Sequence, residues 1–537
     1  MKHLSTLLAL LFCALPGLSR PAPQQLPPGH DHAAHAAHAQ AVGTEEAMSM
    51  RRDEPWPERV LDLAAGLPIQ DGGRIKPLST YADFTLLRIN GKRSVRLEDK
   101  TRLSSVEWLL DTLFFPTQAA EYPVFLVQNH EVIEAMGIDH AGKKERDRYS
   151  LSELEPGLQK LSQLASEYHG IDEKRRSSMQ HQVVALWSNV IGFGQIISRP
   201  EALAIVPPTS DTPEWVSVSE DSEAFRAFAE LVRARGDMPL FEEQLAAFNG
   251  LTVGRAIARG EYEKIPLERF YYKTKTVPRS LYVYIAAFLA TALLWLLPRS
   301  KWLYRATIGL VSGATGLLIF GIVLRCLIRN RPPVSTLYET VLFVVAVGSL
   351  VAIATEFINK QRVAISAAAI LGMAGMFVAN GYELLDKRDT MPSLVAVLDT
   401  NFWLATHVTC ITTGYSAGML AALLASVYLI AKTLRLKRDD PGFFKNTARM
   451  VYGVTCFALI FSLVGTILGG IWANDSWGRF WGWDPKENGA LLICISQIAI
   501  LHGRMGGFLR DQGFCMAAAF GGTVVAFSWW GVNLLGV

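Results

Sequence analysis

Residues 306–324 read ATIGLVSGATGLLIFGIVL, a run without a single charged side chain. Because a helix needs about 20 predominantly apolar residues to cross the hydrocarbon core of a bilayer, this run predicts a membrane-spanning helix. Comparable runs recur after Pro278 and predict eight spans, at 281–297, 306–324, 337–355, 363–380, 402–431, 451–471, 488–502 and 514–533. We therefore expect an all-α polytopic membrane domain over residues 279–537.

The composition of the whole chain agrees with a large membrane part. Hydrophobic residues make up 50% of the 537 residues and charged residues only 19%, a balance too apolar for an ordinary soluble protein. The formal net charge of +3 gives no overall positive field for a phosphate backbone, which excludes nucleic acid as a partner. None of the six cysteines stands at C-x-x-C spacing, which argues against a thioredoxin-like function and a disulfide-stapled fold.

The N-terminal half of the chain has a different character. Residues 1–19 predict a cleaved secretory signal peptide, because their apolar run is too short to span a membrane and small residues follow it. Residues 20–55 are rich in Pro, Ala, Gln and Gly and predict a flexible linker. Residues 56–278 have the composition of a globular domain, with helical periodicity at 104–114, for example. We expect a mostly helical, exported domain there, whose role the sequence leaves open.

Lysine and arginine residues concentrate in alternate loops between the predicted spans. Loops rich in lysine and arginine face the cytoplasm in most membrane proteins. Their alternation along the chain places residues 20–280 on the outer side of the membrane. The signal peptide independently predicts the same location. The basic residues are Arg299, Lys301, Arg305, Lys360, Arg362, Lys432, Arg435, Lys437, Arg438, Lys445, Arg449, Arg504 and Arg510. Against this bias, Arg325, Arg329 and Arg331 fall on the outer side, where they could meet an anion.

The loop between the sixth and seventh predicted spans is rich in tryptophan. Residues 471–492 read IWANDSWGRFWGWDPKENGALL, and the loop at 472–487 carries Trp472, Trp477, Trp481, Trp483, Asp484 and Glu487. The indoles offer a wide, flat apolar surface, and the two carboxylates can orient the loop or the edge of a ligand. An aromatic belt at the membrane surface would account for two or three tryptophans, but not for the spacing W-G-x-x-W-x-W-D-P-x-E. The loop predicts a planar, amphiphilic ligand.

WGRFWGWDPKE (477–487) resembles the tryptophan-rich WWD signature of the haem-handling membrane proteins of cytochrome c maturation. Across roughly residues 281–537 the chain resembles the CcsA (ResC) type of system II cytochrome c synthase, in the segments NRPPVSTLYET (330–340), NFWLATHVTCITTGYSAGML (401–420), ILHGR (500–504) and FSWWGVNLLGV (527–537). LPIQDGGRIKPLSTYADF (67–84) resembles the N-terminal extension of long family members. The resemblance does not reveal what that extension does.

Only two of the eleven histidines, His407 and His502, lie in the membrane half. The resemblance implies that both bind the iron of haem b, His407 on the outer side beside the tryptophans and His502 on the inner side. The alternative for His407 is a histidine at a helix end that is hydrogen-bonded only to backbone. The alternative for His502 is an ordinary residue at the membrane boundary. Arg325, Arg329 and Arg331 could pair with the haem propionates or serve only membrane and loop contacts.

The resemblance also implies a second outer histidine shortly after FSWWGVNLLGV, whereas this sequence stops at Val537. The expected second ligand then belongs to a missing C-terminal segment, which is the preferred interpretation, to a partner, to His130, His140, His169 or His181, or to the cluster His30, His32, His35 and His38. That cluster could itself bind copper, zinc or haem weakly, although a solvated linker is the favoured interpretation.

The function implied is that of a holocytochrome c synthase (haem lyase) component in the bacterial cytoplasmic (inner) membrane, with the N-terminal domain and the WWD loop on the periplasmic side. It would transport haem outward for thioether attachment to C-x-x-C-H motifs of apocytochrome c, with a CcsB (ResB)-like protein and thiol-reducing proteins as partners. No catalytic residue of this chain is expected, because the thiols belong to the substrate. The alternatives are a haem chaperone or exporter without attachment activity, and a structural subunit of a respiratory assembly complex.

Overall fold

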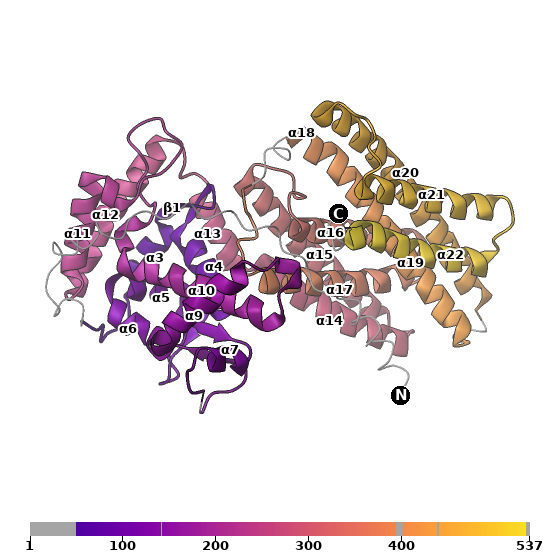
Figure 1. Cartoon of the computed structure of the whole chain (residues 1–537). Helices are drawn as coiled ribbons and strands as arrows, with labels where there is room; N and C mark the ends of the chain where they lie inside the picture. Colours follow the sequence, from indigo (N-terminus) through magenta and orange to yellow (C-terminus); the bar gives the residue numbers. More distant parts are fainter. Residues whose placement is uncertain (1–49, 141, 394–400, 438–439, 533–537) are drawn as a thin grey trace. The chain divides into compact units, whose positions relative to one another are not determined.

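A computed structural model describes residues 50–140, 142–393, 401–437 and 440–532 (Figure 1). The predicted signal peptide, most of the predicted linker and the histidines at 30–38 lie outside the described residues. Within them the chain forms two compact units. The N-terminal unit contains residues 50–274 together with Glu383–Ser393, and the membrane unit contains Lys275–Tyr382 and the described residues from Asn401 onward.

The N-terminal unit is mostly helical, as expected. Its helices are α3 (Glu58–Gly66), α4 (Leu78–Asn90), α5 (Ser105–Phe114), α6 (Pro116–Ala120), α7 (His130–Ala135), α8 (Leu151–Leu154), α9 (Leu158–His169), α10 (Ser178–Ser198), α11 (Ser222–Ala234), α12 (Met238–Ala258) and α13 (Ile265–Thr274). Three antiparallel strand pairs accompany them, β1 (Pro68–Asp71) with β2 (Arg74–Pro77), β3 (Ser94–Arg96) with β4 (Arg102–Ser104), and β5 (Phe125–Val127) with β6 (Asp147–Tyr149).

The core of this unit forms around α5. Ser104 caps the helix in a reciprocal capping box with Glu107, which satisfies backbone donors that the first turn leaves without partners. Trp108 is completely buried and stacks on Phe193 of α10, with ring centroids 6.0 Å apart. The same helix carries the fully buried Asp111, which accepts bonds from Trp56 and other donors, so a polar network as well as apolar packing fixes this helix.

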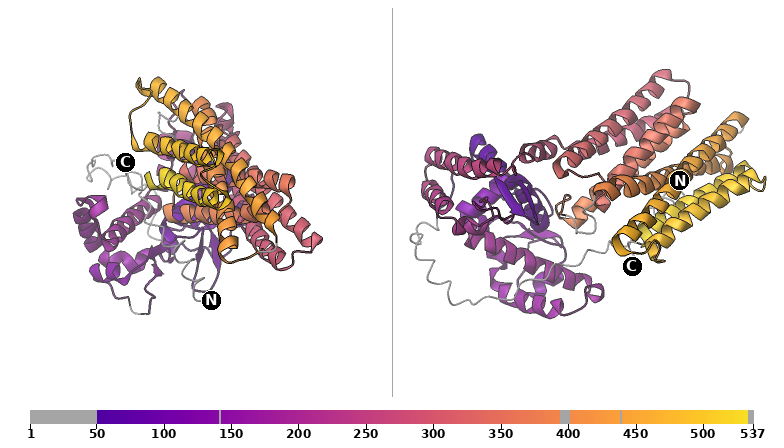
Figure 2. Two further views of the ribbon diagram at one scale, coloured as in Figure 1. Left: turned by 90° about the vertical axis from the view of Figure 1, so that its right-hand side faces the viewer. Right: turned by 90° about the horizontal axis from the view of Figure 1, so that it is seen from above.

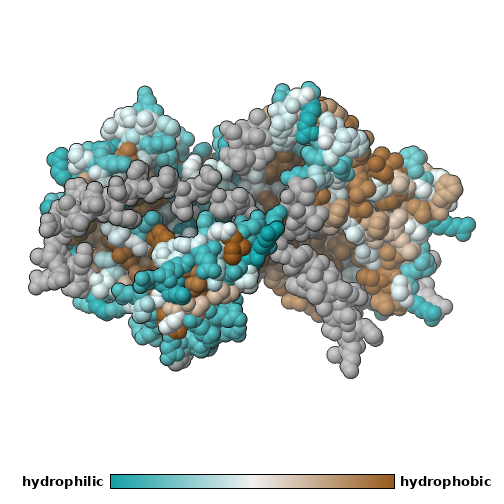
Figure 3. Space-filling view, in the orientation of Figure 1, coloured by the Kyte–Doolittle hydropathy of each residue, from teal (hydrophilic) through white to brown (hydrophobic). Residues whose placement is uncertain are grey.

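The membrane unit consists of long helices that run side by side (Figure 2). They are α14 (Thr276–Leu296), α15 (Lys301–Arg329), α16 (Leu337–Asn359), α17 (Val363–Asp386), α18 (Asn401–Trp403), α19 (Thr409–Thr433), α20 (Pro441–Trp477), α21 (Pro485–Met505) and α22 (Asp511–Ala526). Two π-helical turns interrupt the pattern, η7 (Leu404–Val408) before α19 and η8 (Phe527–Gly531) after α22. Much of this unit's surface is hydrophobic, whereas the N-terminal unit is mostly hydrophilic (Figure 3).

Seven helical stretches in the described residues are long and apolar enough to cross a membrane. They cover seven of the eight predicted spans. The remaining predicted span, the seventh in the chain at 488–502, forms α21 but is not among these helical stretches. Polar residues such as Asn488, Gln497 and His502 lower the mean hydropathy of α21, because each costs free energy on transfer from water to hydrocarbon.

Small residues allow α19 and α20 to approach closely. A Cβ atom on Gly414 would lie 2.7 Å from the backbone nitrogen of Ser462, and one on Gly465 would lie 2.7 Å from that of Ile411. Glycine at helix contacts lets backbones meet and increases van der Waals packing, which drives helix association in lipid. The close contact fixes the start of α19, and with it η7, against the middle of α20.

Arg325, one of the three arginines predicted to lie on the outer side, is buried and forms an ion pair inside the protein. It is 1% exposed, and its Nη2 donates to Oε1 of Glu339 over 2.8 Å. The other carboxylate oxygen of Glu339 accepts from the backbone N–H of Ser335 over 3.1 Å. A buried charge needs such a partner, so this arginine holds the NRPPVSTLYET corner together, and its predicted encounter with an anion is met by an internal carboxylate.

Candidate functional site

His407 lies in the π-helical turn η7, a local irregularity that often accompanies functional sites. Its Nδ1 atom is 2.7 Å from the carbonyl oxygen of Gly465 on α20. A carbonyl oxygen can only accept, so Nδ1 must carry the proton. The neutral imidazole then has its lone pair on Nε2, which is the arrangement that a metal-ligating histidine requires.

The imidazole ring rests on a glycine of α20. A Cβ atom on Gly469 would lie 2.6 Å from Cε1 of His407, 3.0 Å from Nδ1 and 3.3 Å from Nε2. Any side chain at this position would therefore displace the ring. Gly465 and Gly469, one helical turn apart, together provide the hydrogen-bond acceptor and the space that fix the imidazole.

Two of the predicted site tryptophans, Trp472 and Trp477, lie on α20 and form a row of rings that begins at the imidazole of His407. The ring centroids of His407 and Trp472 are 5.6 Å apart, and those of Trp472 and Trp477 are 6.4 Å apart. The Nε1 of Trp472 is buried and has no hydrogen-bond partner among the described residues. Both tryptophans lie in the last turns of α20, which ends when Gly478 adopts a left-handed conformation. The predicted loop at 472–487 is thus partly helical.

The other two tryptophans, Trp481 and Trp483, form a separate pair in the short loop that follows. Their rings are nearly perpendicular, with centroids 6.2 Å apart. Trp483 is 69% exposed and Trp477 is 55% exposed, a costly arrangement for apolar rings in water. Trp483 also has a φ of +59°, a left-handed conformation in which a large side chain costs about 1–3 kcal/mol. The loop holds this ring in a strained, exposed position.

Asp484 and Glu487 orient the loop by capping α21. Oδ1 of Asp484 accepts from the backbone N–H of Lys486 and Glu487 at 2.8 and 2.9 Å. In return, Oε2 of Glu487 accepts from the backbone N–H of Gly482 over 2.6 Å and of Asp484 over 3.3 Å. The D-P-x-E spacing is a helix-capping signal, so of the two predicted roles the structure shows the orientation of the loop.

Two further contacts that the sequence interpretation missed lie around this loop. Asn488 donates from Nδ2 to the carbonyl oxygen of Trp483 over 2.9 Å, which helps to fix the strained residue. The indole of Trp403, just before η7, donates to Asp475 of α20 over 3.3 Å. The second bond joins residues 72 positions apart and therefore leaves no local pattern in the sequence.

Trp529 and Trp530, in the second π-helical turn η8, also went unrecognised as possible site residues. Their rings stack with centroids 4.5 Å apart. The turn packs on the first part of α21, since a Cβ atom on Gly489 would lie 3.1 Å from Cβ of Ser528. Trp529 and Trp530 are therefore at the same end of α21 as the WWD loop. The two adjacent tryptophans in FSWWG could have indicated from the sequence that these residues belong to the site.

His502 is at the opposite end of α21. Its Nδ1 is 3.0 Å from the carbonyl oxygen of Ile498, one turn earlier, so here too Nδ1 carries the proton and Nε2 the lone pair. The side chain is exposed. At about 1.5 Å per residue, the helix separates His502 from the WWD loop by roughly 27 Å. The structure thus places the two histidines at two separate positions, one at each end of the helix bundle.

The other histidines proposed as a second ligand lie in the N-terminal unit. His130 and His140 stack on each other with ring centroids 4.2 Å apart, and Nε2 of His140 is 3.0 Å from Glu134. His181 contacts the backbone of its own helix. No three metal-binding side chains converge within the described ranges.

Comparison with known proteins points to one family. Residues 334–537 match the family of cytochrome C assembly proteins. The chain is 25% identical over 494 residues to the protein NrfI of Wolinella succinogenes, an alignment that covers 86% of this chain and 52% of NrfI. The chain thus spans about half the length of that relative.

Similarity to proteins named cytochrome c biogenesis protein CcsA is confined to the membrane half. The protein from Parasynechococcus marenigrum is 28% identical over 255 residues, covering 42% of this chain and 83% of the relative. The protein from Chlamydomonas reinhardtii is 29% identical over 240 residues, covering 42% of this chain and 65% of the relative. In its membrane half, the chain is thus similar to the CcsA-type cytochrome c biogenesis proteins.

Proposed function

We propose that this protein takes up haem b at the inner side of a bacterial cytoplasmic membrane, near His502, and presents it on the periplasmic side beside His407 and the WWD loop. There the haem is attached to C-x-x-C-H segments of apocytochrome c. Similarity to this family supports a role in cytochrome c biogenesis. The alternation of basic loops along the sequence supports this orientation.

The observation that carries the proposal is the fixed tautomer of His407. Its Nδ1 donates to Gly465, so the nitrogen left to bind iron is Nε2, and the ring cannot rotate without losing this bond. Trp472 and Trp477 extend an aromatic surface from the imidazole, and Trp483 presents an exposed ring. A planar porphyrin needs both an axial nitrogen and such flat apolar contacts.

The proposed reaction needs no nucleophile from this chain. Each substrate thiol adds across one haem vinyl group, so that a C–S bond forms, the S–H hydrogen passes to the neighbouring vinyl carbon, and no oxidant is consumed. The residues of this chain position the haem and the substrate, because holding two reactants in a fixed geometry can remove much of the entropic cost of bringing them together. We assign this positioning to His407 and to the tryptophans that α20 and the capped loop hold in place.

The partners proposed are those that this chemistry requires. Apocytochrome c supplies the thiols, thiol-reducing proteins keep them reduced, and a CcsB (ResB)-like membrane protein completes the synthase. The two alternatives, a haem exporter without attachment activity and a structural subunit, differ from this proposal in measurable products. An exporter binds haem but yields no thioether bond, and a structural subunit binds no haem.

The experiment compares wild type with His407→Ala and with Gln163→Ala, a control at an exposed residue of α9 to which no role is assigned. Each chain is produced with its CcsB-like partner in a bacterium that lacks its own cytochrome c maturation genes. We expect covalent cytochrome c from wild type and the control, and a loss of at least about tenfold with His407→Ala, equivalent to about 1.4 kcal/mol. Equal yields from all three chains would refute the role of His407. Haem in the purified proteins without any covalent product would favour the exporter.

A further inference from the structure

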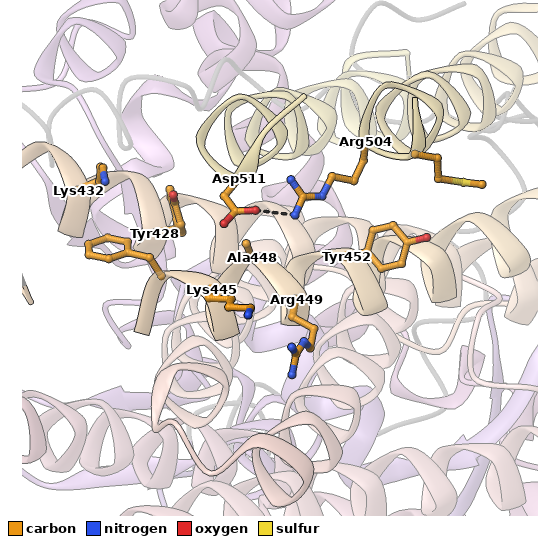
Figure 4. Close-up of a pocket in the computed structure, with 10 residues that line it drawn as sticks. Tyr428, Lys432, Lys445, Ala448, Arg449, Tyr452, Arg504 and Asp511 are labelled. Carbon is orange, nitrogen blue, oxygen red and sulfur yellow. Dashed lines mark hydrogen bonds and ion pairs between the residues drawn. The ribbon is translucent and has the colours of Figure 1, made fainter. Parts of the chain in front are cut away.

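A basic pocket lies where α19 and α21 end and where α20 and α22 begin (Figure 4). It has a volume of about 640 Å³ and is lined by Tyr428, Lys432, Phe444, Lys445, Ala448, Arg449, Tyr452, Arg504, Met505 and Asp511. The lining residues lie in the terminal parts of α19, α20, α21 and α22.

The pocket carries more positive charge than its own carboxylate can balance. Four of its residues are cations, and Asp511 is the one acid. Arg504 pairs with Asp511 over 2.5 Å, which satisfies both. Lys445 and Arg449 pair with no carboxylate in the described part of the chain, and their i, i+4 spacing on α20 places the two charges on one face of the helix. Like charges at this spacing repel, so an anion bound between them would stabilise the pocket.

The surroundings of these charges are apolar. Phe444, Tyr428 and Tyr452 line the pocket with aromatic rings, and Lys432 is 5.0 Å from the ring of Phe444. On the side of α21, Met505 is 74% exposed, and Phe508 in the following turn is 88% exposed. A small soluble anion would leave this apolar surface uncovered, whereas an anion that carries hydrocarbon chains would cover it.

We propose that the basic pocket binds the phosphate headgroup of an anionic membrane lipid, with phosphatidylglycerol as the test ligand. Lys445 and Arg449 contact the phosphate, and the acyl chains lie along Met505 and Phe508. Basic pockets between membrane helices on the cytoplasmic side are suited to such headgroups. Neither histidine lines the pocket, although Arg504 and Met505 lie two and three residues after His502 on α21.

Native mass spectrometry of the purified full chain in detergent tests the proposal. The pocket variant carries Lys445→Gln and Arg449→Gln. The control carries Lys301→Gln and Arg305→Gln, an exposed basic pair with the same spacing at the start of α15. We expect wild type and control to bind phosphatidylglycerol in preference to phosphatidylcholine. The pocket variant should bind it about 30-fold more weakly, at roughly fivefold per cation.

Two further arms identify the source of the anion. sn-Glycerol 3-phosphate, which has the charge without the acyl chains, should not displace the lipid at equal concentration, and neither should haem. Displacement by glycerol phosphate would show a site for soluble phosphate, and displacement by haem a site for its carboxylates; either result overturns the lipid assignment. Equal losses in the pocket and control variants, at matched thermal stability, would show nonspecific attraction and overturn it as well.

Discussion

Gly469 and His407 are packed so closely that a methyl group on the glycine would lie 2.6 Å from Cε1 of the imidazole. This distance is far below van der Waals contact, so one of the two residues would have to move. The 2.7 Å bond from Nδ1 to the carbonyl oxygen of Gly465, one turn earlier on the same helix, restrains such a movement. The imidazole is therefore held by two glycines of α20 that do no chemistry themselves.

Gly469→Ala should disturb the outer site while leaving the chain inserted in the membrane. We expect the displaced imidazole to reduce covalent cytochrome c at least about tenfold, because overpacking at a well-packed position typically costs 1–3 kcal/mol. Gly453→Ala is the matched control, since it lies on the same helix and a Cβ atom there meets nothing within 4 Å. If both variants retained full yield, the position of the ring would not matter for attachment.

Substitutions at the strained residue Trp483 should affect the stability of the loop and the haem content of the protein differently. Trp483→Gly should relieve the left-handed backbone and raise the free energy of unfolding of the loop by about 1 kcal/mol, whereas Trp483→Ala should keep the strain. Both remove the ring, so both should lower the haem content of the purified protein to a similar extent. Thermal unfolding and haem absorbance are the two measurements. Full haem content in either variant would show that the ring does not contact haem.

Substitutions of Asp484 test whether its negative charge matters beyond capping α21. Asn is as good a helix cap as Asp, whereas Ala loses the cap and about 1 kcal/mol. If Asp484 acts only by orienting the loop, Asp484→Asn should retain most of the cytochrome c yield and Asp484→Ala should lose several-fold. An Asn variant as defective as the Ala variant would indicate instead that the carboxylate charge itself acts on the haem or its iron.

The segment Glu383–Ser393 should make the N-terminal unit sensitive to acid. Asp389 lies 2.7 Å from Nη2 of Arg74 and 3.0 Å from Nζ of Lys76. Burial by itself would raise the pKa of Asp389, but the charges of Arg74 and then Lys76 outweigh it and lower the pKa to about 2. Since an unfolded aspartate has a pKa of about 3.9, this difference contributes about 3 kcal/mol of stability above pH 5.

That contribution should be lost as the pH falls from about 4 to 2, because the folded carboxylate then takes up its proton. The measurement is hydrogen exchange of β1 and β2 in the full chain, for wild type and Asp389→Asn. We expect wild type to be more protected at neutral pH and the two proteins to converge near pH 2. A difference that persisted unchanged at pH 2 would contradict a role for the ionised carboxylate.

The positions of the membrane helices were largely determined by the sequence alone, whereas some helices extend well beyond the predicted runs, as α20 (Pro441–Trp477) extends beyond 451–471. Each apolar run carries its own free energy of transfer to the membrane, which is nearly a sum over residues and needs no knowledge of neighbours. The same holds for the cap at Asp484, whose partner Glu487 is three residues away, and for the WWD spacing that indicated the family. Polar residues make this sum less favourable for α21, so the sequence supports a membrane span less strongly there than at the other predicted spans.

The tertiary structure decided which residues meet across long distances in the chain. The contact between His407 and Gly465 joins residues 58 positions apart, and that between Arg74 and Asp389 joins residues 315 positions apart. Buried groups such as Arg325 likewise acquire their partners only when helices pack, and packing also brings the cations of α19, α20 and α21 to one pocket. Composition and periodicity report how each segment interacts with solvent or lipid, whereas a binding site depends on the distances between segments, which only the packed helices fix.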